Sequence, residues 1–269
     1  MIVNRDSGSY DATLCDTIKG AFEAHGGQIE RVLSLPKDQL PKAADANAAD
    51  IELIVVFTGD GTINATVDAL NGWGGALLVL PGGTMNLLSR KLHGDADPID
   101  IVRVAMVEGC KRVKLPVAEV CGLRSLVGIV AGPTAAWGDV REDLRQRDLG
   151  RLVDSVPQAL QETLDGAPVS VDGVEGEFQA IFIDPEAEGL RAEGIEAGTA
   201  LELLQHGWAW LMGDFRDGPS TPLICAHKLT LLRDEDIALL VDGEQASVKS
   251  PCSVSLGQCA LSFITTRAE

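Results

Sequence analysis

Apolar runs alternate with segments of helical spacing along the first third of the chain. Residues 51–57 and 76–80 are rich in Ile, Val and Leu, which is typical of buried strands. By the same criteria we expect further strands at residues 1–4 and 29–35, and helices at residues 11–25, 36–50, 63–70 and 85–92. Strands and helices that alternate in this way predict a parallel sheet with helices on both faces.

The pattern changes after residue 114. The segment "LPVAEVCGLRSLVGIVAG" predicts two strands around a Gly-containing turn, and the charged residues 139–164 predict a helix. Further short strands are expected at residues 169–174, 177–183 and 228–232, and within "IALLVDGEQASVKSP" and "CALSFIT". We therefore predict two domains: an α/β domain of residues 1–114 and a β-rich, antiparallel domain of residues 115–269, whose C-terminal tail could return to the first domain.

Composition and charge exclude several classes of protein. Hydrophobic residues make up 45% of the chain, which favours a folded protein with a proper core over disorder. The net charge of −18 argues against a nucleic-acid partner. The start of the chain has no secretory pattern, and residues 69–89, the longest uncharged run, are interrupted by five glycines and Pro81. Six scattered cysteines without a CxxC pair favour neither a zinc site nor a disulfide framework, and they fit a reduced cytoplasm.

An acidic residue stands between two glycines in "VVFTGDGTINATVDAL", where a predicted strand meets a predicted helix. Ligands of parallel α/β sheets bind beyond the carboxyl ends of the strands, and Gly59 and Gly61 would let the backbone approach a ligand closely. The start of the following helix suits phosphate, but Asp60 would repel it. Asp60 is therefore expected to lie beside a magnesium ion or to act as a base toward an attacking hydroxyl. From the spacing alone, a strand-to-helix turn with Asp60 as a helix cap is equally open.

Two further turns repeat this arrangement. The segment "VLPGGTMNLLSRKL" places Gly82, Gly83 and Thr84 after the next strand, with Asn86 two residues further on. The segment "VNRDSGSY" places Asn4, Ser7 and Gly8 after the first strand. Neither segment is a Walker-type loop or a dinucleotide fingerprint. Polar, glycine-rich turns at three successive strand ends predict a phosphate-binding site more strongly than any one of them alone.

Together these motifs resemble the catalytic family of diacylglycerol kinases, which includes bacterial lipid kinases and sphingosine kinases. The family motif GGDGT followed by Asn or Glu is similar to residues 58–64, "TGDGTIN", in which Thr58 replaces a glycine. The motif P-x-G-T-x-N is matched by residues 81–86, and N-P-x-S-G by residues 4–8, with Arg5 in place of proline. A family D-G-E element is matched by Asp242-Gly243-Glu244.

The resemblance implies an ATP-binding α/β domain similar to those of phosphofructokinase and NAD kinase, followed by a β-sandwich that holds the acceptor, with the active site in the cleft between them. It implies that Asp60 or Glu244 is the base, and that Glu244 could instead help bind nucleotide or magnesium. Asp60 is the implied metal contact, direct or through water. The residues implied to bind nucleotide are Asn4, Ser7, Gly8, Ser34, Thr58, Gly59, Gly61, Thr62, Asn64, Gly82, Gly83, Thr84 and Asn86, where Ser34 replaces a family threonine.

The leading interpretation is an enzyme that uses ATP and Mg²⁺ to phosphorylate a lipid hydroxyl, such as that of diacylglycerol or a sphingoid base. It implies a cytoplasmic location with transient peripheral contact at a membrane, and the acidic surface disfavours anionic bilayers. An NAD kinase-like enzyme and a non-catalytic nucleotide-binding module are the alternatives. Two further groups have both a functional and a structural interpretation. Contact with phosphate or a solvated helix face would each explain Arg141, Arg145, Arg147 and Arg151. A lipid-contact edge or ordinary helix packing would each explain Trp208 and Trp210.

Overall fold

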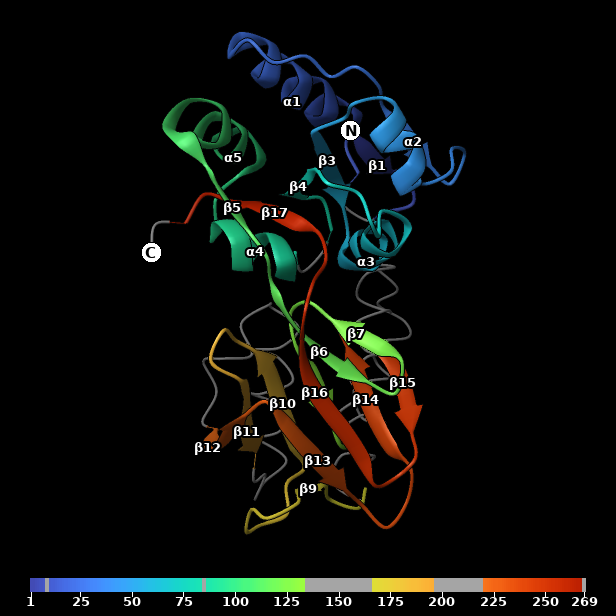
Figure 1. The fold of residues 1–269 in the computed structure, drawn as a ribbon, viewed down its shortest axis with the longest axis vertical. Coiled ribbons are helices and arrows are strands. Elements are labelled where there is room, and N and C mark those ends of the chain that lie inside the picture. The colour runs from blue at the N-terminus through green and yellow to red at the C-terminus, as the bar shows by residue number, and fades with distance from the viewer. Residues whose placement is uncertain (8–9, 84–85, 134–165, 196–219, 268–269) are drawn as a thin grey trace, which may run out of the picture. The chain divides into compact units, whose positions relative to one another are not determined.

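The computed structural model describes residues 1–7, 10–83, 86–133, 166–195 and 220–267 of the chain. The chain forms two compact units, which are drawn in Figure 1. The first unit is Met1–Leu115 together with Cys259–Glu269, and the second is Pro116–Gln258. The predicted arginine-rich helix and the pair Trp208 and Trp210 lie outside the described residues.

The first unit is built on a six-stranded, mostly parallel sheet. Its strands are β1 (Ile2–Asn4), β2 (Leu33–Leu35), β3 (Leu53–Thr58), β4 (Ala76–Pro81), β5 (Lys111–Val113) and β17 (Ser262–Thr265). They are arranged in the order β2-β1-β3-β4-β17-β5, and β5 is antiparallel to its neighbour β17. Strand β17 comes from the end of the chain and pairs in parallel with β4. The central strands β3 and β4 therefore each pair with a neighbouring strand on both sides.

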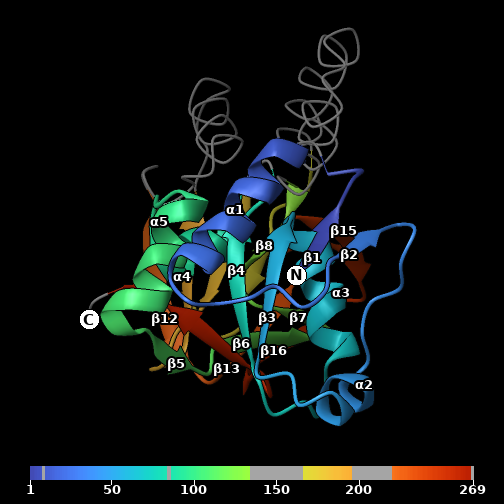
Figure 2. The ribbon, with the colours of Figure 1, turned by 90° about the horizontal axis from the view of Figure 1, so that it is seen from above.

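Helices lie on both sides of this sheet, as Figures 1 and 2 show. They are α1 (Ala12–Ala24), α2 (Ala43–Ala48), α3 (Asp60–Ala69), α4 (Leu87–His93) and α5 (Pro98–Arg103), which continues into a π-helical turn, Val104–Gly109. Ile18 and Phe22 of α1 and Ile101 of α5 pack with Val55 and Leu78 of the sheet in one buried cluster. Helix α3 contacts β3, and α4 contacts β4 and β17. The apolar faces of α1, α3, α4 and α5 are thus buried against the sheet.

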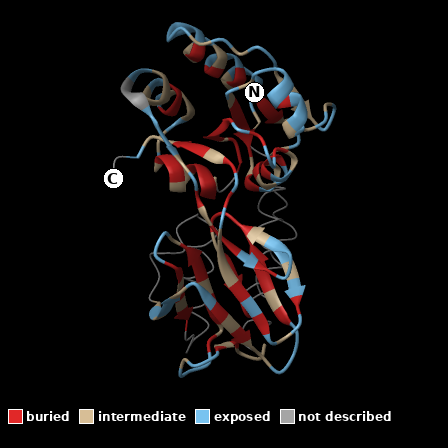
Figure 3. Ribbon diagram, in the orientation of Figure 1, coloured by how far each residue is buried: buried red, intermediate tan, exposed pale blue. Residues whose placement is uncertain are grey.

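The second unit is a sandwich of two antiparallel sheets. One sheet has the order β12-β11-β10-β8-β14-β15 and the other the order β7-β6-β16-β13-β9. The strands are β6 (Pro116–Val120), β7 (Leu123–Ser125), β8 (Ile129–Ala131), β9 (Ser170–Val171), β10 (Ala180–Pro185), β11 (Leu190–Ile195), β12 (Thr221–Ala226), β13 (Lys228–Leu232), β14 (Ile237–Val241), β15 (Glu244–Val248) and β16 (Cys252–Gln258). Ile183 and Leu239 from the first sheet and Leu231 and Val254 from the second share one buried cluster. Buried and exposed positions alternate along these strands in Figure 3, as expected for sheets that pack through one face.

The predicted fold class is confirmed: the first unit is α/β with a mostly parallel sheet, and the second is β-rich and antiparallel. Several predicted elements were wrong in detail. The helix predicted over residues 36–50 is limited to Ala43–Ala48. The segment predicted to contain two strands holds three, because β8 follows β7 after a short loop. Helix α5 and strand β5 were not predicted. No helix among the described residues is long and apolar enough to span a membrane.

Candidate functional site

Three polar turns follow neighbouring parallel strands of the first sheet. Strands β1 and β3 pair in parallel, and β3 pairs in parallel with β4. The chain leaves these strands at Asn4, Thr58 and Pro81, so the three turns begin at the same edge of the sheet. This is the edge at which open α/β sheets bind their ligands.

Side-chain hydrogen bonds tie the first turn to the other two. The Asn4 Nδ2 donates to the Thr62 Oγ1 at 3.1 Å, which connects the end of β1 to the first turn of α3. The Ser7 Oγ donates to the carbonyl oxygen of Gly82 at 2.7 Å. Two of the predicted nucleotide-binding side chains therefore contact the predicted turns of other strands, and the three motifs form one connected structure.

The second and third turns touch through their glycines. A Cβ atom added to Gly83 would lie 2.6 Å from the Gly59 Cα, which is too close for any side chain. A Cβ at Gly82 would lie 2.6 Å from the backbone nitrogen of Thr58. Neither Gly82 nor Gly83 has a positive φ, so the requirement for glycine comes from close backbone contact and not from a left-handed conformation.

Asn86 fixes the shape of the turn after β4. It has a left-handed backbone, with φ of 52°, which Asn tolerates better than most residues. Its Oδ1 accepts from the Gly83 nitrogen at 2.6 Å, and its Nδ2 donates to the Gly83 carbonyl oxygen at 3.0 Å. The side chain of Asn86 makes no cap hydrogen bond to α4. The described contacts of Asn86 thus stabilise the glycine turn.

Asp60 supplies the cap that α4 lacks. It is the first residue of α3 and is only 6% exposed. Its Oδ2 accepts from the Leu87 nitrogen at 3.3 Å, and its Oδ1 accepts from the Leu88 nitrogen at 3.2 Å. A carboxylate is favourable beside the first N–H groups of a helix. Asp60 therefore begins α3 and caps the following helix, α4.

A comparison with protein families concerns this unit. The family model of the diacylglycerol kinase catalytic domain matches residues 1–117. These residues are therefore similar to that catalytic domain. The resemblance inferred from the motifs is thereby confirmed.

Solved structures agree with the fold of the whole chain. Two structures of a candidate diacylglycerol kinase from Bacillus anthracis str. Sterne align with TM-scores of 0.63 and 0.64, each at 20% identity. A crystal structure of a diacylglycerol kinase from the same organism aligns with a TM-score of 0.62 at 18% identity. Each alignment covers 98% of this chain and 95% of the other. At these identities the likeness establishes the fold alone. No curated protein matches the chain.

The other residues predicted to bind nucleotide differ in their contacts. Thr58 is buried, and its Oγ1 donates to the Gly59 carbonyl oxygen at 3.2 Å. The Ser34 backbone nitrogen donates to the Asp38 Oδ2 at 2.7 Å. Gly61 is exposed and Asn64 half-buried in α3. Gly8 and Thr84 lie outside the described residues.

The chemistry of this part of the domain is compatible with magnesium. Among the described residues, no cluster of three or more His, Cys, Asp or Glu side chains could hold a metal by itself. Magnesium, however, is usually held by one or two carboxylates together with water and substrate phosphates. Asp60 is one buried carboxylate among three connected turns, so the donor set fits a magnesium ion that arrives with nucleotide phosphates.

Glu244 lies in the second unit, as the first residue of β15. It is exposed and pairs with Val241 across a two-residue hairpin turn formed by Asp242 and Gly243. Both turn residues have positive φ, 49° and 85°, which is the pattern of a type I′ turn. The hairpin therefore presents Glu244 at its tip.

Sequence reasoning did not find the role of Asp242. Its carboxylate is 3% exposed and accepts from the Ser125 Oγ at 2.5 Å. It also accepts from the backbone nitrogens of Leu126 and Val127, both at 2.9 Å, and of Gly128 at 3.3 Å. An Asp-Gly pair between apolar runs signals the turn, but nothing in the sequence signals these partners, which lie more than 110 residues away.

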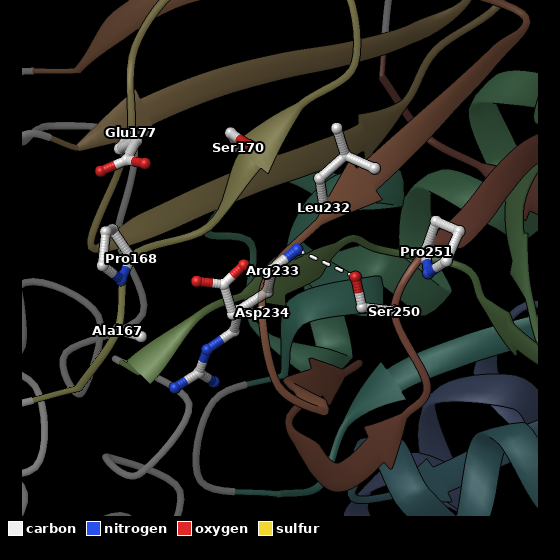
Figure 4. Close-up of a pocket in the computed structure, with 9 residues that line it drawn as sticks. All are labelled: Ala167, Pro168, Ser170, Glu177, Leu232, Arg233, Asp234, Ser250 and Pro251. Atoms are coloured by element: carbon white, nitrogen blue, oxygen red, sulfur yellow. Dashed lines mark hydrogen bonds between the residues drawn. The ribbon is translucent and has the colours of Figure 1, made fainter.

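A cavity of about 370 Å³ lies in the second unit, away from all the predicted site residues (Figure 4). Arg233 lines it, with its Nη1 donating to the Asp236 carbonyl oxygen at 3.1 Å and its backbone nitrogen to the Ser250 Oγ at 2.9 Å. Glu177 and Asp234 also line the cavity, so its charges are mixed. No predicted role falls on this cavity.

Proposed function

We propose that the protein is an ATP-dependent lipid kinase that transfers the γ-phosphoryl group to a lipid hydroxyl, such as that of diacylglycerol or a sphingoid base. The observation that carries this proposal is the match of the diacylglycerol kinase catalytic domain to residues 1–117, which contain the three connected turns at the ends of β1, β3 and β4. In the proposal the first unit binds the nucleotide and the second unit binds the lipid.

The three turns have the properties that a phosphate site requires. The backbone of Gly59 lies against that of Gly83, and Gly59, as the N-cap of α3, has no side chain that could cap the helix. Backbone N–H groups at such a helix start attract phosphate oxygens. We assign nucleotide contact to the turns around Gly59, Gly83 and Asn4, with Thr62 held in place by Asn4. Phosphoryl transfer depends mainly on positioning and charge neutralisation, which rigid turns can supply.

Asp60 and Glu244 receive different roles. Asp60 is buried and accepts two backbone hydrogen bonds from α4, which supports a role in fixing the turns. Its carboxylate would also contact a magnesium ion bound to the nucleotide phosphates. Magnesium, when bound, neutralises charge on the β- and γ-phosphates. Glu244 is exposed at the tip of a hairpin, which supports its role as the base that takes the proton from the acceptor hydroxyl. The assignment predicts that both residues are needed for turnover.

A labelled-ATP assay tests the proposal. The protein would be incubated with γ-labelled ATP and Mg²⁺, with micelles that contain diacylglycerol or sphingosine, and separately with NAD. Label in the lipid fraction that depends on Glu244 is the expected result. Glu188→Gln serves as the matched control, because Glu188 is an exposed glutamate of the same unit. Label in NAD would favour the NAD kinase-like alternative. ATP binding without transfer to any acceptor would favour the non-catalytic module.

A further inference from the structure

Two cysteines of the second unit lie unusually close to each other. The Cys121 Sγ and the Cys252 Sγ are 3.4 Å apart, and all six cysteines of the chain are free thiols. Strand β6 pairs with β16 up to the pair Val120 and Val254. Cys121 follows Val120 directly and Cys252 precedes Val254 by two residues, so the ladder brings the two backbone segments close together. Cys121 itself lies in the turn after β6, with a φ of 48°, and its side chain lies beside Cys252.

The environments of the two thiols differ in a way that suits stepwise oxidation. Cys121 is exposed, whereas Cys252 is 1% exposed. Burial, together with a hydrogen bond to Cys121, raises the pKa of Cys252 to about 12. An external oxidant can reach Cys121, and Cys252 is shielded from solvent but lies beside it.

The backbone at Cys121 adds an independent observation. Cys121 and Gly122 form the two-residue turn between β6 and β7, with φ of 48° and 82°. The first position of such a turn strongly favours Asn, Asp or Gly, because a left-handed backbone strains other residues. A cysteine at this position is contrary to the residue preference of the turn, and residues with a strained backbone are often found at functional sites.

We propose that Cys121 and Cys252 form a dithiol modification site that closes to a disulfide when the protein meets a small disulfide oxidant such as oxidised glutathione. The site belongs to the second unit alone and does not depend on the kinase proposal.

The reaction takes place in two exchanges. The Cys121 thiolate attacks one sulfur of oxidised glutathione, so that a mixed disulfide forms and one reduced glutathione leaves. Cys252 then loses its proton and attacks the Cys121 sulfur, which forms the intramolecular disulfide and releases the second glutathione. The protein loses two electrons and two protons, and the oxidant is reduced to two thiols. The sulfurs must approach by about 1.4 Å to reach a disulfide bond length of about 2.0 Å. The high pKa of Cys252 makes the second exchange the slow one.

The disulfide would close a loop between residues 131 positions apart. Because long closed loops restrict the unfolded chain, the oxidised protein should melt at a higher temperature, by about 5 °C or more. Reduction with a dithiol should reverse the shift. The disulfide would also restrict the motion of the turn between β6 and β7. Strand β7 ends at Ser125, which donates a hydrogen bond to Asp242.

Mass spectrometry of the full chain tests the inference. After incubation with oxidised glutathione, unreduced digestion should yield a linked peptide containing Cys121 and Cys252, with no glutathione on either cysteine. Cys121→Ser and Cys252→Ala should each abolish the linked peptide, and Cys252→Ala should trap glutathione on Cys121. Cys225→Ser is the matched control, because Cys225 is also an exposed cysteine of this unit, and it should leave the link intact.

Two results would overturn the inference. One is a wild-type protein whose Cys121 stays glutathionylated without a linked peptide after prolonged incubation. The other is a linked peptide that joins a different pair of cysteines. Both are read from the wild-type chain, so they remain decisive even if the Cys252 variant does not fold.

Discussion

At the scale of single residues, the contacts of Asp60 explain why a carboxylate lies between two glycines. It caps α4 with both of its oxygens, and it therefore ties the turn after β3 to the turn after β4. The position of this acid is explained by structure before any chemistry is added. A catalytic or metal-binding role must be tested against that structural role, and a loss of activity alone does not distinguish them.

We expect Asp60→Asn to abolish turnover and also to destabilise the protein by about 1–2 kcal/mol. Leu87 and Leu88 donate to different oxygens of Asp60, and an asparagine would turn an NH₂ group toward one of these donors. Asp97→Asn is the matched control. Asp97 caps α5 with a single oxygen, which accepts from both Ile99 and Asp100, so asparagine can replace it at little cost. Chemical denaturation and lipid kinase assays on both variants measure the two effects separately. Wild-type turnover in Asp60→Asn would exclude the proposed contact of Asp60 with magnesium, and it would also exclude Asp60 as a base.

The glycines of the turns provide a matched pair of substitutions. A Cβ at Gly83 would lie 2.6 Å from the Gly59 Cα, whereas a Cβ at Gly59 would meet the Gly83 Cα at an ordinary 3.7 Å. Gly83→Ala should therefore cost about 1–3 kcal/mol through a forced backbone shift, and Gly83→Val should also lose affinity for Mg-ATP. Gly59→Ala should melt within about 1 °C of the wild type.

Calorimetric titration with Mg-ATP then isolates nucleotide contact. If the backbone of Gly59 lies against phosphate, Gly59→Ala should weaken binding although its fold is intact. Unchanged affinity in both Gly59→Ala and Gly83→Val, with a lower melting temperature in Gly83→Val alone, would mean that the glycines serve only the packing of the turns.

His93 makes stability depend on pH. It is 6% exposed, and its Nδ1 lies 2.9 Å from the Thr266 Oγ1. Burial, with the nearby Arg267 acting in the same direction, lowers the pKa of His93 to about 4. The unfolded chain, with a His pKa of about 6.5, then binds more protons between pH 6.5 and 4. Stability from this residue is complete above about pH 6.5 and falls as the pH decreases through that window, by about 3 kcal/mol at most.

We expect His93→Gln to lose less stability than the wild type between pH 6.5 and 5. His25→Gln is the control, because His25 is exposed. Thermal melts across this range, read as the difference from the wild type, separate the histidine from the titration of the many carboxylates. Parallel curves for wild type and His93→Gln would contradict the assignment.

At the scale of elements, sequence patterns predicted the first unit better than the second. Strand β3 and helix α3 could be read from a local run of apolar residues and its spacing. The second unit depends on contacts between distant segments. The loop between β7 and β8 is shaped by Asp242, whose partners begin 117 residues earlier, so no local pattern could indicate that this segment holds a third strand. The role of Asp60 as a cap for α4 was hidden for the same reason, since its partners lie 27 and 28 residues away.

The hairpin of β14 and β15 should be unusually sensitive to its first turn residue. Asp242→Ala leaves the donors at Ser125, Leu126 and Val127 without their shared acceptor, and we expect a loss of about 3 kcal/mol. Asp242→Asn keeps the left-handed backbone and one oxygen, so its loss should be smaller.

Asp172→Asn is the control for the hairpin, because Asp172 also precedes a turn glycine but is exposed. Denaturant unfolding measures all three variants. Equal stability of Asp242→Ala and wild type would contradict the inferred role of the carboxylate.

At the scale of the whole molecule, a strand near the end of the chain belongs to the sheet of the first unit. Strand β17 returns from the second unit to pair with β4, and β5 joins it from the end of the first segment. A short apolar run such as "SFIT" has no feature that selects one sheet over the other. The pairing of β17 means that the chain crosses between the units twice. A truncation before residue 259 would remove the strand that lies between β4 and β5 in the first sheet.

The dependence of one reaction on both units is tested by Glu244. Asp60 belongs to the first unit and Glu244 to the second, so a requirement for both would make the proposed transfer a property of the whole chain. Glu244→Gln keeps the size of the side chain at an exposed strand end, and the fold should tolerate it. A base acts chiefly in the transition state, so the substitution should lower kcat by about 100-fold or more while the affinity for ATP changes little.

Gln245→Glu, which moves a carboxylate one position along the strand, should not restore activity in the Glu244→Gln background, because adjacent strand residues point to opposite faces. A decrease in kcat below about threefold on an identified lipid acceptor would remove Glu244 from the proposal and leave Asp60 as the remaining candidate base.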